Sequence, residues 1–284
     1  MAKKKTIHEF SLMKKEGKKI TFLTSYDFPT ARFAEEAGLD MLLVGDSLGM
    51  CVYGYEGTVP VTMDQMICHA EAVRRGAPGT FVIGDMPFMS YQVSAERAVE
   101  NAGRFLKEAG SDAIKLEGGK RVASLIRAIV DAGIVVMGHI GLTPQSSGQL
   151  GGHKAQGRTA EQARLVVEDA LAVQAAGAHM ILLEAIPPEV GDYIARTLTI
   201  PVLSIGAGPC CDGQLLIVSD LIGQFQAFTP KFVKKYCDVA GVVTDAMKRY
   251  CDDVRKGTFP DSSHCYAMLE GEEEKFRTLL REPR

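Results

Sequence analysis

The chain has 284 residues, 46% of them hydrophobic and 24% charged, which suits one α/β barrel or two smaller domains. Its formal net charge of −3 gives no overall attraction to nucleic acid or to an anionic membrane, and we expect neither as a partner. No apolar run approaches the roughly 18 residues of a membrane span, and no secretory signal is recognised. Seven scattered cysteines without a CxxC pattern are typical of free thiols, so we expect a cytoplasmic protein.

Short apolar runs recur along the chain, and helical stretches separate them. In chain order, strands are expected at 19–27, 41–47, 81–87, 113–117, 135–139, 180–184, 201–208 and 214–220. Helices are expected at 29–38, 62–76, 94–110, 120–133, 159–177 and 187–199, and several close with Ala-Gly, a helix C-terminal signal. An amphipathic helix at 7–17 precedes the first strand. A helical extension starts at about 229 and runs to 257, with a break near Ala240-Gly241.

The repeated strand–loop–helix unit, with eight strands, predicts a (β/α)8 TIM barrel of the α/β class, as a single domain over 1–284. The alternative is an open doubly wound sheet. That fold would want a GxGxxG turn after the first strand, where this chain has SYDFP. Two long Gly-rich loops, 48–61 and 141–158, interrupt the pattern, and loops of this length are often functional.

Five of the apolar runs deliver charged side chains at or near their ends. Such runs are typical of buried parallel strands, whose C-terminal ends meet at one mouth of a closed barrel. The residues delivered there are Asp46, Asp85, Lys115 with Glu117, His139 and Glu184. A buried cluster of acids is costly unless a metal or a proton-transfer task holds it in place.

Asp46 and Asp85 each follow an apolar run and a glycine, and together they predict an oxygen-rich site for Mg²⁺. The structural alternative is that each caps the following helix. Lys115 and Glu117 flank Leu116 of a strand, so both lie on the same face, and both point into the barrel if Leu116 faces the helices. The alternative for this pair is a structural ion pair that fills the barrel.

Glu184 ends an otherwise apolar strand, where burial would raise its pKa and suit it to act as a general base. The alternatives are a helix-capping or metal-bridging acid. His139 is either functional or a hydrogen-bonded core residue, and the spacing leaves both open. The SIGAG turn at 204–208 would let a backbone approach a ligand closely, but any tight turn explains it as well.

No nucleophile elbow, P-loop or HExxH motif is present. A metal held by acids beside a lysine suits enolisation of a 2-oxo acid. In that chemistry the cation chelates the carboxylate and keto oxygens while a base removes the neighbouring C–H proton.

Those residues and their surroundings resemble the ketopantoate hydroxymethyltransferase family from about residue 19 to 266. The motifs that carry the resemblance are TSYDFPTARFAEEAGLDMLLVGDSLGMCVYGYEGTVPVTMDQM, GDMPFMSY, AIKLEGG, GHIGLTPQS, LLEAIP, IGAGPCCDGQLLIVSDLIG, FVKKY and FPDSSHCY. So many motifs in one order make the resemblance specific. Small departures at Ser204, Cys211 and Cys265-Tyr266 do not touch the expected site.

The resemblance implies an isocitrate-lyase-like barrel of the phosphoenolpyruvate/pyruvate superfamily. It implies transfer of a hydroxymethyl group from 5,10-methylenetetrahydrofolate to 3-methyl-2-oxobutanoate, giving 2-dehydropantoate for pantothenate and coenzyme A. It also implies a cytoplasmic homo-oligomer, expected to be a decamer.

The resemblance also assigns roles to residues. Asp46, Asp85 and Glu117 attend Mg²⁺, with Glu117 acting directly or through water. Asp46, Ser47, Asp85 and Lys115 contact the 2-oxo acid. Glu184 is the proton acceptor, and His139 is expected near the substrate carboxylate or a metal-bound water.

Two other hypotheses remain open from the sequence. A related Mg²⁺-dependent C–C lyase acting on a 2-hydroxy acid would share the barrel, but such lyases carry a KKCGH-type loop that this chain lacks. A catalytically silent barrel serving as a scaffold would have no reason to keep unneutralised acids at its mouth.

Overall fold

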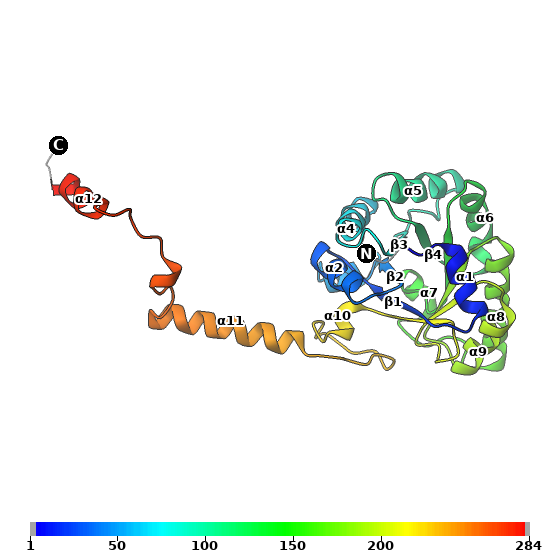
Figure 1. Ribbon diagram of the computed structural model, residues 1–284. Coiled ribbons are helices and arrows are strands. Elements are labelled where there is room, and N and C mark those ends of the chain that lie inside the picture. Colours follow the sequence, from blue (N-terminus) through cyan, green and yellow to red (C-terminus); the bar gives the residue numbers. More distant parts are fainter. Residues whose placement is uncertain (1–3, 282–284) are drawn as a thin grey trace. The chain divides into compact units, whose positions relative to one another are not determined.

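A computed structural model describes residues 4–281, and its centre is a closed barrel of eight parallel strands in the order β1 to β8 (Figure 1). The strands are β1 (Ile20–Thr24), β2 (Met41–Val44), β3 (Phe81–Asp85), β4 (Ala113–Glu117), β5 (Val136–Gly141), β6 (Met180–Glu184), β7 (Val202–Ile205) and β8 (Gly213–Leu216). Every expected strand is present, although most are shorter than the apolar run that predicted them. The barrel prediction is confirmed, and the open sheet is excluded.

Helices lie before, between and after the strands, and the longer ones that follow strands cover the outside of the barrel (Figure 1). They are α1 (Ile7–Lys15), α2 (Phe28–Glu36), α3 (Leu48–Cys51), α4 (Met63–Gly76), α5 (Ala95–Lys107), α6 (Ala123–Asp131), α7 (Ser147–Leu150), α8 (Ala160–Ala175), α9 (Pro188–Thr197) and α10 (Val218–Leu221). The glycines of the Ala-Gly closures have φ between 64° and 97°, the left-handed conformation of a helix C-terminus; they are Gly38, Gly110, Gly133 and Gly177.

The barrel interior has an apolar end and a charged end. Phe10 of α1 is fully buried and meets Phe81, at the start of β3, in an edge-to-face contact with ring centroids 5.2 Å apart. The N-terminal helix therefore closes the barrel at the N-terminal ends of its strands. The charged residues lie toward the opposite ends of the strands, which is where parallel barrels carry their active sites.

The strand register sets these charged residues side by side. The aligned pairs are Asp85 with Lys115, Glu117 with His139, and Gly141 with Glu184. A parallel pairing brings aligned residues into direct lateral contact, so the register itself assembles the cluster. A slip by one residue in any of these pairings would turn a charged side chain from the interior toward the helices.

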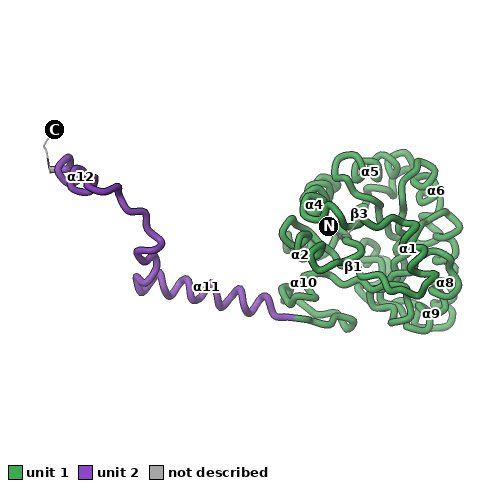
Figure 2. Tube along the Cα trace, in the orientation of Figure 1, with its two compact units in different colours: residues 1–236 green, residues 237–284 purple. Residues whose placement is uncertain are grey.

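The chain divides into two compact units, residues 1–236 and 237–284 (Figure 2). The second unit holds α11 (Val239–Lys256) and α12 (Glu272–Arg281). The helix expected from about 229 begins at Val239. The Asp238 carboxylate accepts the Gly241 amide proton and so caps the N-terminus of α11. The expected break near Ala240-Gly241 does not occur. The assignment of 1–284 to a single domain stays a prediction.

The long loops contain short helices. Loop 48–61 opens with α3, and loop 141–158 contains a 3-10 turn (Pro144–Ser146) and α7. None of the helices within residues 4–281 has the length and apolarity needed to cross a membrane. Six cysteines are free thiols, as expected; they are Cys51, Cys68, Cys210, Cys211, Cys251 and Cys265.

Gly84 gives a stability test of the barrel wall. An added Cβ at Gly84 would overlap the ring of Phe105, which packs from α5 onto β3. We predict that Gly84→Ala lowers the free energy of unfolding by about 1–3 kcal/mol, because the core cannot take the extra methyl group without shifting. Chemical denaturation would measure the loss.

The matched control is Gly103→Ala on α5, where an added Cβ meets nothing within 4 Å. This change should be neutral or stabilising by up to about 1 kcal/mol, since alanine is the better helix former. Equal losses in the two variants would contradict the packing argument.

Candidate active site

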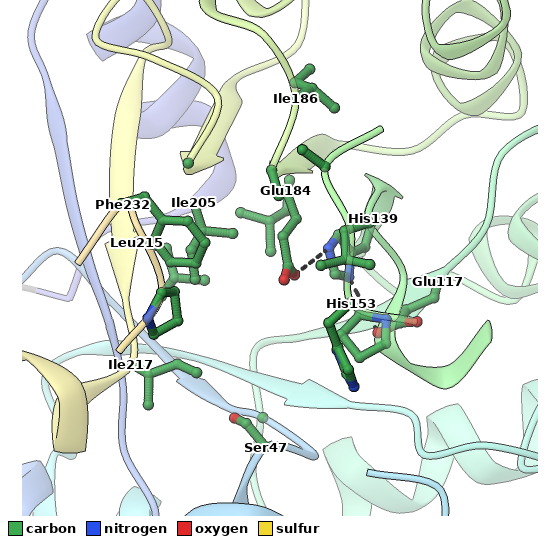
Figure 3. A pocket seen from close by; sticks show the side chains of 18 of the residues that line it. Ser47, Glu117, His139, His153, Glu184, Ile186, Ile205, Leu215, Ile217 and Phe232 are labelled. Carbon is green, nitrogen blue, oxygen red and sulfur yellow. Dashed lines mark ion pairs between the residues drawn. The ribbon is translucent and has the colours of Figure 1, made fainter. Parts of the chain in front are cut away.

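The six charged or titratable residues expected at the mouth line one cavity of about 750 Å³, together with Ser47. Figure 3 labels Glu117, His139, Glu184 and Ser47 among them. They come from the ends of β2 to β6 and the turn after β2; they are Asp46, Asp85, Lys115, Glu117, His139 and Glu184. All but Glu184 are at most 4% exposed. Residues far apart in the sequence thus converge on one enclosed space.

Lys115 is the buried cation of this cluster. Its Nζ lies 2.8 Å from Asp85 Oδ1 and 3.9 Å from Glu117 Oε1. Burial opposes the charged ammonium, but the carboxylates of Asp85, Glu117 and Asp46 outweigh it and raise the pKa of Lys115 above its ordinary value. The lysine is therefore protonated, with Asp85 as its closest carboxylate partner and Glu117 as its second, and the structural ion pair stays an alternative.

Asp46, in the turn after β2, lies beside Asp85, at the end of β3. The Asp46 amide donates to Asp85 Oδ2 at 3.0 Å. Burial raises the pKa of both carboxyl groups to about 6, and neighbouring carboxylates add to the effect. Neither residue is a helix cap: Ser94 caps the helix after Asp85, and Ser47 stands at the N-terminus of α3. The capping alternative is wrong for both.

Gln145 and Tyr91 join the cluster, and neither was predicted from the sequence. Gln145 Nε2 donates to Asp46 Oδ2 at 2.9 Å, and its backbone N–H donates to Glu117 Oε2 at 3.1 Å. The Tyr91 hydroxyl donates to Gln145 Oε1 at 2.8 Å. Since the amide oxygen faces a donor, the amide nitrogen must face Asp46, and the orientation of the side chain is fixed.

Glu117 is held by several neighbours. Burial raises its pKa to about 7, while the Lys115 ammonium and the Gln145 amide act in the opposite direction. The Tyr91 hydroxyl accepts the Glu117 amide proton at 3.1 Å. Glu117 thus sits between the ionised and neutral forms near pH 7, poised to respond to any cation that enters the cavity.

His139 bridges Lys115 and Glu184. Its Nδ1 lies 3.2 Å from Lys115 Nζ, and its Nε2 lies 3.1 Å from Glu184 Oε2, at an angle outside ordinary hydrogen-bond geometry (Figure 3). Burial and the Lys115 charge lower the pKa of His139, so its ring is neutral at pH 7. A Lys115 proton donated to Nδ1 places the ring proton on Nε2, toward Glu184, whereas a ring proton on Nδ1 would face Glu117 Oε1, 3.4 Å away.

Glu184 is the most accessible acid, with a side chain 15% exposed. Burial raises its pKa, and His139 counteracts part of that rise. It does not cap α9, whose N-cap residue is Pro187. An accessible carboxylate with a raised pKa at the centre of a cavity has the properties of a general base.

Ser47 follows Asp46, and its hydroxyl lies 2.8 Å from the Tyr26 hydroxyl. Thr24 Oγ1 donates to the same phenol at 3.0 Å. This chain of hydroxyls fixes Ser47 beside the acids, where it can bond to a polar ligand.

The donor set fits Mg²⁺. Asp46 and Asp85 offer carboxylate oxygens, and Asp85 Oδ1, 2.8 Å from the Lys115 ammonium, is fully buried without a well-aligned hydrogen bond. Within residues 4–281, no group of three or more His, Cys, Asp or Glu side chains is placed to hold a metal ion. Mg²⁺ commonly takes one or two carboxylates and completes its shell with substrate oxygens and water, so two acids with an open side suit it.

The opposite side of the cavity is apolar. Figure 3 shows Phe232, Ile205 and Leu215 across an open space from His139, with Glu184 between the two sides. The SIGAG turn explains part of this wall: an added Cβ at Gly206 would come within 2.5 Å of the Phe232 ring. The missing Cβ of Gly206 therefore leaves room for the Phe232 ring, which forms part of this apolar wall.

Comparisons with known proteins agree with this picture. The family model "Ketopantoate hydroxymethyltransferase" matches residues 4–262. The 3-methyl-2-oxobutanoate hydroxymethyltransferase of Alkaliphilus metalliredigens is 63% identical over 99% of this chain and 99% of its own.

Solved structures of lower identity share the fold. Phosphonopyruvate hydrolase in complex with oxalate and Mg²⁺ matches with a TM-score of 0.61 at 14% identity, covering 98% of this chain and 99% of its own. A 2,3-dimethylmalate lyase, a member of the PEP mutase/isocitrate lyase superfamily, matches with a TM-score of 0.60 at 19% identity, covering 98% and 95%. These likenesses show the shared barrel fold.

The raised pKa values predict how metal-free stability depends on pH. The folded state binds protons at Asp46 and Asp85 more tightly than the unfolded chain does, because their folded pKa of about 6 exceeds the unfolded value of about 3.9. Their stabilising contribution is complete below about pH 4 and is lost as pH rises through about 6. We predict that Asp46→Asn gains stability relative to wild type between pH 5 and pH 8.

Thermal unfolding in EDTA at several pH values would measure this difference. The comparison cancels the titration of groups that the two proteins share. A difference between variant and wild type that stays constant, or shrinks, from pH 5 to pH 8 would contradict the electrostatic account of the cluster.

Proposed function

Because this chain belongs to the ketopantoate hydroxymethyltransferase family, we propose that it transfers a hydroxymethyl group from 5,10-methylenetetrahydrofolate to 3-methyl-2-oxobutanoate, giving 2-dehydropantoate. The observation that carries the proposal is the cavity in which two paired acids, a buried lysine and an accessible glutamate converge. The reaction would serve pantothenate and coenzyme A synthesis in the cytoplasm.

The 2-oxo acid would bind at the charged side of the cavity. Lys115 supplies a fixed positive charge for its carboxylate or keto oxygen, and the Ser47 hydroxyl supplies a hydrogen bond. Asp46 and Asp85 would hold Mg²⁺, with Glu117 directly or through water. A bound Mg²⁺ supplies Lewis-acid polarisation of the carboxylate and keto oxygens. The oxalate and Mg²⁺ of phosphonopyruvate hydrolase, a protein of the same fold, are in keeping with this arrangement.

Glu184 would remove the single proton at C3 of the 2-oxo acid. Its raised pKa strengthens it as a base, and His139 Nε2 lies 3.1 Å from its Oε2. Lys115 offsets the negative charge that develops on the keto oxygen as the C–H bond breaks. His139 would act through Glu184 and Lys115, both of which it faces.

The carbon–carbon bond would form next. C3 would bond to the one-carbon unit and water would supply the hydroxyl oxygen of the product, while both carbon–nitrogen bonds of the methylene bridge, to N5 and N10 of the folate, break. The two folate nitrogens take up the C3 proton carried by Glu184 and one proton of the water, so the carboxylate is ready for another cycle.

Family membership separates this proposal from its rivals. A C–C lyase on the same barrel, such as the 2,3-dimethylmalate lyase, is only 19% identical, whereas the named transferase is 63% identical over nearly the whole chain. A silent scaffold would not explain three acids packed around one lysine, with Glu184 as a fourth acid at the same cavity.

A homo-oligomer, expected to be a decamer, is part of the proposal. Large apolar side chains are exposed along α11; they are Val242, Val243, Met247, Tyr250 and Val254. Contiguous exposed apolar surface of this kind marks protein contacts, which supports assembly of several copies.

Removal of the base gives the first functional test. Glu184→Gln keeps the shape of the side chain and abolishes proton abstraction. We predict that turnover falls by about 10²–10⁴-fold, while the 2-oxo acid with Mg²⁺ still raises the unfolding temperature. Steady-state assays and thermal shifts would measure the two effects. Turnover at the wild-type rate would sink the assignment of Glu184.

Removal of the metal gives the second test. We predict that the enzyme with Mg²⁺ and no folate exchanges the C3 proton of 3-methyl-2-oxobutanoate for deuterium in heavy water. Proton NMR would show the methyl doublet collapsing to a singlet, and EDTA should stop the collapse because the metal polarises the keto group. Exchange that continues undiminished in EDTA would contradict metal-assisted enolisation.

A further inference from the structure

The cavity is larger than a small branched 2-oxo acid needs. At about 750 Å³ it lies in the range of sites that enclose drug-sized ligands. The acids and Lys115 occupy one side, and the opposite side has no role in the binding of the oxo acid. Figure 3 shows Phe232, Ile205 and Leu215 on that side, facing Glu184 across the open space.

Phe232 provides a flat aromatic surface at this wall. Its ring packs on Gly206, whose φ of 78° and lack of a Cβ allow the close approach. Phe228 also lines the cavity and remains 53% exposed, although it makes an edge-to-face contact with Phe225 at 5.3 Å. Exposed aromatic rings at a cavity are surfaces on which planar ligands stack.

Unpaired cations stand at the same cavity. The side chains of Arg158 and Lys231 line it, both residues are exposed, and neither side chain forms an ion pair with a carboxylate of residues 4–281. Elsewhere on the surface, basic side chains close to acids do pair: Lys120 and Arg164 share Glu168. The free cations therefore complement a ligand that carries negative charge outside the acid-rich side of the cavity.

We propose that the Phe232 wall and its Arg158–Lys231 rim form the binding site of the reduced-folate co-substrate. This inference rests on the proposed function, which requires a one-carbon donor but does not say where it binds. The folate has a planar pterin ring at one end and glutamate carboxylates at the other. The pterin lies against Phe232, and the carboxylates reach Arg158 and Lys231.

The placement matches the order of the chemistry. Glu184 lies between the charged side and the Phe232 wall, so the carbon that it deprotonates faces the wall (Figure 3). A pterin on that wall presents its methylene carbon toward the oxo acid. The negatively charged tail then points away from the acids, which would repel it.

The test measures the binding of tetrahydrofolate to the full-length protein by calorimetry under anaerobic conditions, with the 2-oxo acid and Mg²⁺ present. Arg158→Gln and Lys231→Gln should each weaken tetrahydrofolate binding about fivefold, the scale of a partly exposed ion pair. Neither should change the affinity for 6-methyltetrahydropterin, which lacks the glutamate. Added salt should weaken tetrahydrofolate alone.

Phe232→Leu and Phe232→Ala should weaken both ligands, by about tenfold for alanine, because the pterin is common to them. The leucine variant preserves an apolar contact with Gly206 and guards against a packing defect. The control is Lys234→Gln: Lys234 lies in the same segment but sits over the Tyr236 ring and does not line the cavity. It should leave tetrahydrofolate binding unchanged.

The outcomes separate the inference from the proposed function. Wild-type protein that binds tetrahydrofolate, with affinity indifferent to Arg158, Lys231 and Phe232, would overturn the site and leave the reaction standing. A loss with Lys234→Gln equal to that with Lys231→Gln would also overturn it, as a general charge effect. Wild-type protein that fails to bind tetrahydrofolate would overturn both.

Discussion

The site depends on one buried ammonium group surrounded by acids. Lys115 lies 2.8 Å from Asp85 and 3.2 Å from the ring of His139, and Asp46 and Glu117 complete the cluster. An isolated carboxylate would suffer a large desolvation penalty in this position, and one lysine cannot neutralise three of them. The acid-rich side of the cavity therefore carries net negative charge, which a divalent cation would neutralise.

The Lys115 ammonium also determines how its neighbours are oriented. With Lys115 donating to Nδ1, His139 must carry its proton on Nε2, toward Glu184. A neutral histidine supports the glutamate without protonating it, so the base stays available. Gln145 holds Asp46 in a similar way, by donating a hydrogen bond to its carboxylate, and Tyr91 fixes the orientation of the Gln145 amide. Each functional side chain is thus held by a partner whose own orientation is determined, as accurate positioning of a site requires.

The sequence predicted the part of the site that strand periodicity controls. Asp85, Lys115, Glu117 and Glu184 lie on or at the end of short apolar runs, and a parallel barrel sends all such ends to one mouth. Gln145 could not be found this way: it contacts Asp46 from 99 residues away, through a loop whose path depends on tertiary packing. Nothing local marks one glutamine in a Gly- and Ser-rich loop.

Phe232 was missed for a different reason. A helix was expected from about 229, which would have placed this ring on the outside of the barrel. Residues 229–238 instead stay irregular, and α11 begins only where Asp238 caps it. The gap left by Gly206 gives the ring a better place to pack than a helix face would, and local helix propensity yields to that contact. Gly206 of the SIGAG turn and Phe232 after β8 therefore form one structural feature, the apolar half of the cavity. The other half is charged. A reaction between a 2-oxo acid and a carrier of a one-carbon unit needs both halves.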